Sequence, residues 1–166
     1  ALFHPRNNRT TNAIAKQLLL HPGLTILTNS LELASILSDA ESDVFLIGGH
    51  LRRSSHALIG GWSTSRLRRL HADLAFLGSD GFQEQGGPTS VSYDEASVKA
   101  AAARREQDLH RADSSKALST AQFSYADWSD VSGVITAGSH APEMERLLKD
   151  KARLLIAPPL ARGAES

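Results

Sequence analysis

The chain contains no cysteine, which excludes a disulfide framework and thiolate metal sites and is compatible with a reducing cytosol. No apolar run approaches bilayer length and no signal-peptide pattern is present, so we expect a cytoplasmic protein without a membrane partner. The formal net charge is zero, so the chain lacks the basic field of a dedicated nucleic-acid binder.

The size and the apolar content indicate one globular domain, because 166 residues with 41% hydrophobic residues suffice for an ordinary core. We place this domain at residues 1–157 and interpret residues 158–166, which begin with two prolines, as a loose tail. The chain begins at Ala1 without an initiating methionine, so we expect that upstream sequence has been removed.

Short apolar runs alternate with amphipathic or alanine-rich stretches along the chain. The predicted strands are residues 24–28, 43–47, 72–78, 133–137 and 153–157, with a weaker candidate at 107–112. The predicted helices are residues 11–20, 31–40, 62–70, 94–106 and 143–149. This alternation predicts an α/β fold: a mostly parallel sheet with helices on both faces.

Four polar signatures follow predicted strands. They are Thr28-Asn29-Ser30, Gly48-Gly49-His50-Leu51-Arg52, Gly78-Ser79-Asp80-Gly81 and Ala112-Asp113-Ser114-Ser115-Lys116. Because the carboxyl ends of parallel strands meet at one edge, where small anionic ligands bind, the set points to a ligand site. Lys116 suits phosphate and Asp113 suits hydroxyls, although a loop salt bridge between them explains the same two residues.

The other candidate residues also have a structural explanation. Gly48 and Gly49 allow a tight turn and close approach of a ligand, and Arg52 can close over an anion, but a plain turn fits as well. Neither a dinucleotide fingerprint nor a nucleotide P-loop is present. Asp80 can accept ligand hydroxyls, but holding its own turn is the stronger interpretation. Residues 86–90 read as a flexible loop.

Three further groups receive structural interpretations. Thr10 or Thr11 is expected to cap the first helix, where exposed N–H groups favour an anion. Glu95 and Lys99 have i, i+4 spacing, which indicates a surface pair of small value; a catalytic base at Glu95 is the minority interpretation. The seven histidines show no metal-site spacing, and no catalytic or cofactor set is expected. The arginines of the third predicted helix read as a solvated basic face.

In order and spacing, several segments resemble the C-terminal effector-binding domain of the DeoR family of bacterial transcriptional repressors. They are the four signatures above, Leu58-Ile59-Gly60, Asp73-Leu74-Ala75-Phe76-Leu77, and Asp94-Glu95-Ala96-Ser97-Val98-Lys99. The resemblance spans residues 9 to 157. It implies a fold similar to sugar-phosphate isomerases and CoA transferases, a phosphorylated sugar or related metabolite as effector, homo-oligomers, and operator binding through an N-terminal helix-turn-helix domain absent from this chain.

The resemblance also implies roles for individual residues. Phosphate contacts would come from Thr10, Thr11, Arg52 and Lys116, with Gly48 and Gly49 allowing close approach. Asp80 and Asp113 would bind hydroxyls, with Gly81 in the same turn as Asp80. Two competing hypotheses remain. One is a sugar-phosphate isomerase-like enzyme using Asp80, Glu95 and Lys116 for proton transfer; the other is a degenerate oligomerisation domain.

The chain departs from the family pattern in three places. Arg9-Thr10-Thr11 stands where the family has Gly-Thr-Thr, and the residues before it do not read as an apolar first strand. Residues 107–111 are more polar than the usual strand, and Thr136-Ala137-Gly138 replaces a Thr-Asp turn. We therefore expect an incomplete first strand and an altered phosphate loop, with Lys116 and Arg52 providing most of the anion recognition.

Overall fold

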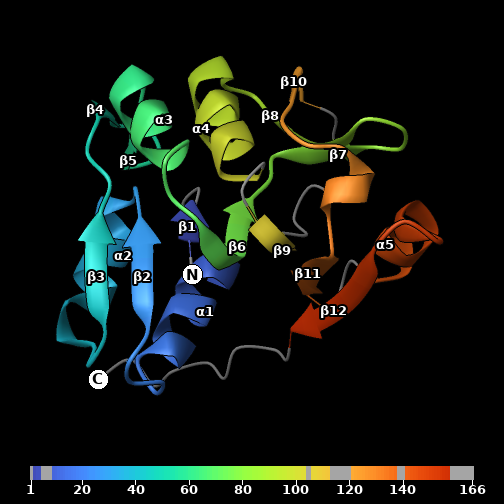
Figure 1. The fold of residues 1–166 in the computed structure, drawn as a ribbon. Coiled ribbons are helices and arrows are strands. Elements are labelled where there is room, and N and C mark those ends of the chain that lie inside the picture. The colour runs from blue at the N-terminus through green and yellow to red at the C-terminus, as the bar shows by residue number, and fades with distance from the viewer. Residues whose placement is uncertain (1, 5–8, 104–105, 113–120, 138–140, 158–166) are drawn as a thin grey trace.

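The protein is described by a computed structural model that covers residues 2–4, 9–103, 106–112, 121–137 and 141–157 (Figure 1). The strands are β1 Leu2–His4, β2 Thr25–Thr28, β3 Asp43–Leu46, β4 His50–Arg52, β5 Ala57–Ile59, β6 Ala72–Gly78, β7 Gly81–Gln83, β8 Gly87–Ser90, β9 Glu106–Ala112, β10 Phe123–Ser124, β11 Gly133–Ala137 and β12 Arg153–Ala157. The helices are α1 Arg9–Leu18, α2 Leu31–Ile36, α3 Gly61–Leu67, α4 Tyr93–Ala103 and α5 Ala141–Leu148, with 3-10 turns η1 Leu37–Asp39 and η2 Trp128–Asp130.

Seven strands form the main sheet in the order β12-β11-β9-β6-β1-β2-β3, and each described pairing within it is parallel. The α/β class is therefore confirmed. The short strand β1 lies between β2 and β6, where Phe3 is opposite Thr28 on one side and Phe76 on the other. The sequence did not predict this strand, because three residues are too few to show a periodic pattern. The weak candidate at residues 107–112 is confirmed as β9.

Helices cover both faces of the main sheet, as neighbouring residues of β6 show. Phe76 packs in a cluster with residues of α1 and α2, including Ala15 and Leu33. Its neighbour Leu77 belongs to the larger cluster, which contains residues of α3, α4 and α5. Successive side chains of a strand point to opposite faces, so the two clusters are separate cores on the two sides of the sheet.

Two small antiparallel sheets accompany the main one, and the sequence predicted neither of them. β4 pairs with β5, and β8 lies between β7 and β10. The interpretation of residues 86–90 as a loop was therefore wrong. The pairs β4–β5 and β7–β8 are joined by short turns, and their strands have too few residues to show a period of two. In Figure 1 the β4–β5 sheet, α3 and α4 lie at the end of the sheet toward which the β2 and β3 arrows point.

Helix positions were predicted better than helix ends. The helix predicted for residues 94–106 ends at Ala103, because residue 106 already belongs to β9. The helix predicted for residues 31–40 becomes 3-10 after Ile36. Ser30 caps α2, and its side chain accepts a hydrogen bond from the Leu33 amide at 3.2 Å. In the described part of the chain no helix is both long and apolar enough to cross a bilayer.

Candidate functional site

The candidate site lies at the carboxyl edge of the main sheet, above β6 and its neighbours. Gly78, the last residue of β6, is opposite Ala112, the last residue of β9. The strand ends that precede two of the predicted signatures are thus side by side, as parallel pairing requires. Asp113 and Lys116 come directly after β9 but lie outside the described residues, so their roles stay predictions.

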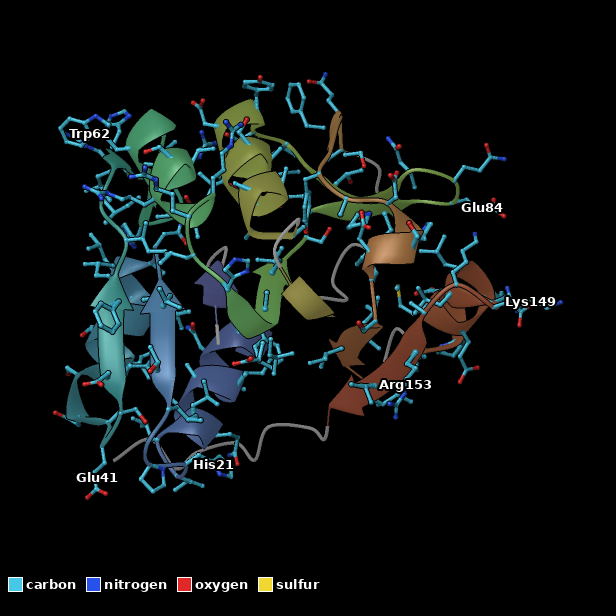
Figure 2. All side chains as sticks on the ribbon, in the orientation of Figure 1. His21, Glu41, Trp62, Glu84, Lys149 and Arg153 are labelled. Carbon is cyan, nitrogen blue, oxygen red and sulfur yellow. The ribbon has the colours of Figure 1, made fainter. Side chains whose placement is uncertain are left out.

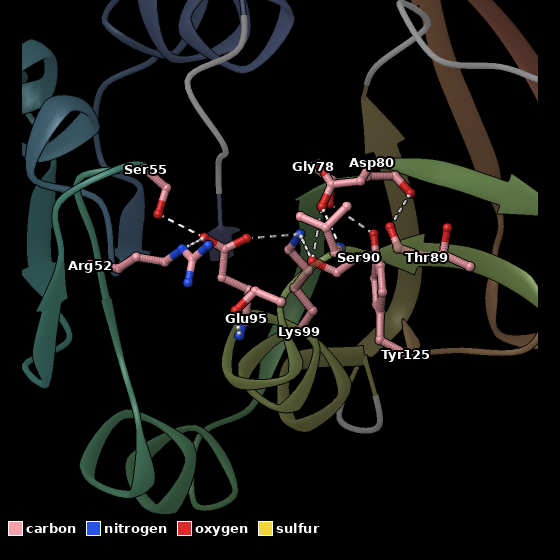
Figure 3. Close-up of polar contacts among 12 residues, drawn as sticks. Arg52, Ser55, Gly78, Asp80, Thr89, Ser90, Glu95, Lys99 and Tyr125 are labelled. Carbon is pink, nitrogen blue, oxygen red and sulfur yellow. Dashed lines mark hydrogen bonds and ion pairs between the residues drawn. The ribbon is translucent and has the colours of Figure 1, made fainter. Parts of the chain in front are cut away.

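A row of alternating charges crosses this edge, and we call Arg52, Glu95, Lys99, Ser90 and Asp80 the charged row (Figure 3). Arg52 Nε lies 3.0 Å from Glu95 Oε1, and Lys99 Nζ lies 4.0 Å from Glu95 Oε2. Lys99 Nζ donates to Ser90 Oγ at 3.3 Å, and Ser90 Oγ donates to Asp80 Oδ2 at 3.0 Å. The row contains two cations and two anions, so it is electrically balanced.

The centre of the row is fully enclosed, because Glu95 is 1% exposed and Lys99 is 0% exposed. The expectation of a surface pair was therefore wrong. A buried charge is tolerated only when it is paired and hydrogen-bonded, and removing one partner of such a pair typically costs about 3–5 kcal/mol. Glu95 Oε1 also accepts a hydrogen bond from Ser55 Oγ at 2.7 Å. Its other oxygen, Oε2, has no hydrogen-bond partner within the described residues.

Tyr125 fixes the position of the buried lysine. The Lys99 ammonium lies 5.2 Å from the centre of the Tyr125 ring, within cation–π range. The phenol in turn donates to the carbonyl oxygen of Gly78 at 2.8 Å, at the end of β6. The row is thereby attached to the carboxyl end of a central strand, and its geometry is set by the sheet.

Asp80 connects the β6 end to the segment before α4. Its Oδ2 accepts hydrogen bonds from Ser90 Oγ and from the Val91 amide at 2.9 Å, and the residue is 3% exposed. The sequence favoured a role within its own turn, but these contacts are with residues 10 and 11 positions further along the chain. Asp80 therefore joins the segment after β6 to the segment before α4, and this contact was not predictable from local turn chemistry.

Arg52 is the accessible end of the row, with 33% of its side chain exposed. Although its Nε lies within ion-pair distance of Glu95, that nitrogen has no aligned hydrogen-bond partner within the described residues. A planar guanidinium in this position can offer its remaining donors to an anion, and it binds phosphate or carboxylate oxygens in pairs.

The predicted glycines and threonines have local explanations. A Cβ on Gly49 would collide with the Ser63 hydroxyl and lie 2.5 Å from the Ile59 carbonyl oxygen, so packing against β5 already requires glycine there. Gly48 has open space around it, and Gly81 begins β7. Thr10 and Thr11 lie inside the first turn of α1, which begins at Arg9, so the prediction that one of them caps the helix was wrong. The Thr11 side chain is fully buried.

Sequence reasoning undervalued Glu95, Lys99 and Tyr125, although one signal for the first two was present. After its first turn the helix is mostly apolar, with Ala96, Val98 and a run of alanines, and such a helix is typically buried. Two charged residues in a buried helix must therefore meet partners. Tyr125 carries no such signal, because its contact with Gly78 joins residues 47 positions apart.

The charged row offers chemistry for a polyol bearing a negative group. Carboxylates can accept hydrogen bonds from hydroxyls, and the exposed Arg52 guanidinium can pair with an anion. Within the described residues, no group of three or more histidine, aspartate or glutamate side chains is placed to hold a metal ion.

Comparison with known proteins gives a consistent result. Residues 8–138 match the family model described as the DeoR C terminal sensor domain. The chain is 32% identical over 113 residues to the HTH-type transcriptional repressor GlcR of Bacillus subtilis, which covers 68% of this chain and 44% of that protein. It is 30% identical over 149 residues to the glycerol-3-phosphate regulon repressor of Haemophilus influenzae, which covers 89% of this chain and 58% of that protein.

A third relative, the HTH-type transcriptional regulator GlpR of Haloferax volcanii, is 36% identical over 90 residues, 54% of this chain and 35% of that protein. The chain thus spans between about a third and three fifths of these relatives. All three are named as regulators of transcription, which agrees with the prediction that the domain is not an enzyme. The family model matches well over half of the chain, and the chain therefore belongs to the family of DeoR C-terminal sensor domains.

Proposed function

We propose that this chain is the effector-sensing domain of a bacterial transcriptional repressor and that its effector is a phosphorylated sugar or a related small metabolite. The observation that carries the proposal is the charged row, which keeps two carboxylates, a lysine and an arginine together at the carboxyl edge of a parallel sheet. The name of the Haemophilus influenzae relative, a glycerol-3-phosphate regulon repressor, agrees with a phosphorylated polyol.

The phosphate end of the effector is assigned to Arg52 and Lys116. Arg52 is the exposed cation of the described row, and the phosphate would compete with Glu95 for its guanidinium. Lys116 would come from the segment after β9, which ends beside β6. Gly48, next to β4, leaves space for the ligand, whereas the glycine at position 49 serves packing as well.

The first turn of α1 would add backbone donors. Thr11 is fully buried, so we assign its contribution to the N–H groups at the helix start together with those of Thr10. The hydroxyls of the effector would contact Asp80 and Asp113, with Gly81 giving the backbone freedom to approach. Asp80 already accepts two hydrogen bonds, and a ligand hydroxyl would share the carboxylate with them.

Regulation follows if the effector binds two arrangements of the protein unequally. In the full-length repressor, we propose that the effector changes how the sensor domains of different subunits are arranged. That change would alter the spacing of helix-turn-helix domains upstream of this chain and thereby the affinity for operator DNA. A helix-turn-helix encoded directly upstream of Ala1 would agree with this arrangement.

A ligand panel tests the proposal. Thermal unfolding of the chain would be followed with glycerol 3-phosphate, hexose phosphates and inorganic phosphate, with the unphosphorylated sugars as matched controls. We expect stabilisation by at least one sugar phosphate, amounting to about 2.7 kcal/mol when the ligand is present at about a hundred times its dissociation constant. No stabilisation at millimolar concentration would favour a pure oligomerisation domain. Turnover of a sugar phosphate, lost in Asp80→Asn, would favour the enzyme.

A further inference from the structure

Although the net charge is zero, the sequence contains an acidic stretch and a basic stretch that meet at β3. Residues 17–43 contain four acidic residues and no lysine or arginine, whereas residues 44–72 contain five arginines and no acidic residue. The sign of the charge therefore changes at the start of β3, which begins with Asp43. Of these charged residues, only Arg52 belongs to the charged row.

The acidic stretch ends in a surface hollow beside the start of β3. The hollow has a volume of about 280 Å³ and is lined by residues 23, 24 and 40–43, which include Glu41 and Asp43. Both of these side chains are exposed. In Figure 2, Glu41 lies near the bottom of the side of the molecule where β3 forms the edge.

The basic stretch ends in a second hollow of similar size, about 300 Å³, on α3. Trp62, Ser65, Arg66 and Arg69 line it, and Trp62 is 81% exposed. Figure 2 shows Trp62 near the top of the same side on which Glu41 lies near the bottom, with β3 between them. One side of the molecule therefore has an acidic end and a basic end of comparable dimensions.

The strand between the two hollows is an open edge. Among the described strands, β3 pairs only with β2. The amides of Asp43 and Ile47 donate to β2 and its neighbouring residues, at 2.9 and 2.7 Å. Because donors alternate along a strand, the N–H groups of Val44 and Leu46 point away from β2 and are available to another strand.

Apolar side chains surround this edge. Phe45 is 56% exposed and Leu46 is 43% exposed, on opposite faces of β3, and Leu51 of β4 is 40% exposed. Phe45 and Leu46 give the centre of this side an apolar character. Exposed apolar side chains on a strand with one open edge indicate a surface that another strand covers.

We propose that β3 is the interface between two copies of this chain, which pair antiparallel through β3 around a twofold axis. A twofold interface must be complementary to itself, because each patch meets the same patch in reverse orientation. Here the rotation places the basic hollow of one copy against the acidic hollow of the other, while Phe45 and Leu46 of both copies meet at the centre. Charge complementarity at the two ends fixes the antiparallel register.

Sedimentation analysis of charge variants tests the interface. Arg66→Glu with Arg69→Glu places like charges in contact, so we expect the dissociation constant of assembly to rise about tenfold or more, and likewise for Glu41→Lys with Asp43→Lys. The matched control is Arg146→Glu, in the last turn of α5, with Lys149→Glu, directly after that helix. It makes the same charge change on the opposite side of the molecule, where Figure 2 shows Lys149. The control should keep the wild-type assembly.

Mixing the two kinds of variant gives the sharper result. The hollow with the two new glutamates on one chain is complementary in charge to the hollow with the two new lysines on the other. The mixture should therefore form heterodimers of twice the 17.8 kDa chain mass. Leu46→Pro removes an outward N–H and should also weaken assembly, while circular dichroism confirms that the fold is retained. A wild-type monomer at high concentration, equal assembly of all variants, or no rescue in the mixture would overturn the proposal.

Discussion

Helix α4 and strand β3 depart from the ordinary distribution of residues in opposite directions. On α4, Glu95 and Lys99 are buried almost completely, whereas on β3 the apolar side chains of Phe45 and Leu46 are exposed. Charged residues are almost never fully buried without partners, and an exposed apolar edge strand invites pairing. We have proposed a role in binding for each departure: an effector site beside α4 and a contact with a second chain along β3.

The largest loss of stability is expected when the buried lysine of α4 is replaced by an uncharged residue. Lys99→Met leaves Glu95 and Asp80 without the buried cation between them, so we expect a loss of about 3–5 kcal/mol in the free energy of unfolding. Urea denaturation measures it, with Lys149→Met, at the exposed residue directly after α5, as the control. A loss below about 1 kcal/mol would mean that the buried charges are not energetically coupled.

The β3 side is tested by comparing two apolar truncations on neighbouring strands. Ile26 of β2 is fully buried, so Ile26→Ala should cost about 2–5 kcal/mol through lost burial and the cavity left behind. Phe45→Ala should change the stability of the dilute monomer by only about 0.5 kcal/mol. Equal losses in thermal or urea unfolding would show that Phe45 belongs to the core of the single chain.

A smaller loss of stability is expected when Tyr125, which contacts Lys99 of α4, is replaced. Tyr125→Phe keeps the ring beside Lys99 but removes the hydrogen bond to the Gly78 carbonyl, so we expect a loss of about 1–2 kcal/mol. Tyr125→Leu removes the ring as well and should cost more, because the cation–π contact is also lost. If both variants lose the same stability, the ring does not contribute to holding the lysine.

The sequence was sufficient to predict those strands that have a clear pattern of apolar residues. Residues 72–78 and 133–137 are strands β6 and β11 with the predicted bounds. The β4–β5 hairpin and β1 were missed, because strands of three residues leave no pattern to detect. The position of β1 depends on pairing with β2 and β6, which lie far away in the sequence, whereas β4 and β5 pair with each other across a short turn.

The candidate site was predicted in location but not in composition. Arg52 and Asp80 were named because each follows a predicted strand, and the structure brings both into the charged row. The burial of Glu95 and Lys99 required knowledge of what covers α4, and i, i+4 spacing alone indicates a surface pair. The hydrogen bonds from Ser90 and Val91 to Asp80 depend on the unpredicted strand β8.

The central claim is that the accessible end of the charged row binds the phosphate of an effector. Arg52 and Arg53 are neighbours, but the structure places only Arg52 against Glu95, while Arg53 is exposed to solvent. Isothermal titration with the sugar phosphate that stabilises the wild-type chain most strongly should therefore give different results for Arg52→Ala and Arg53→Ala.

We predict that Arg52→Ala weakens binding by about tenfold or more, the loss expected when a charged hydrogen-bond donor is removed, and that Arg53→Ala stays within about twofold of the wild type. Unchanged affinity in Arg52→Ala, or equal losses in the two variants, would contradict the assignment of the effector phosphate to this site.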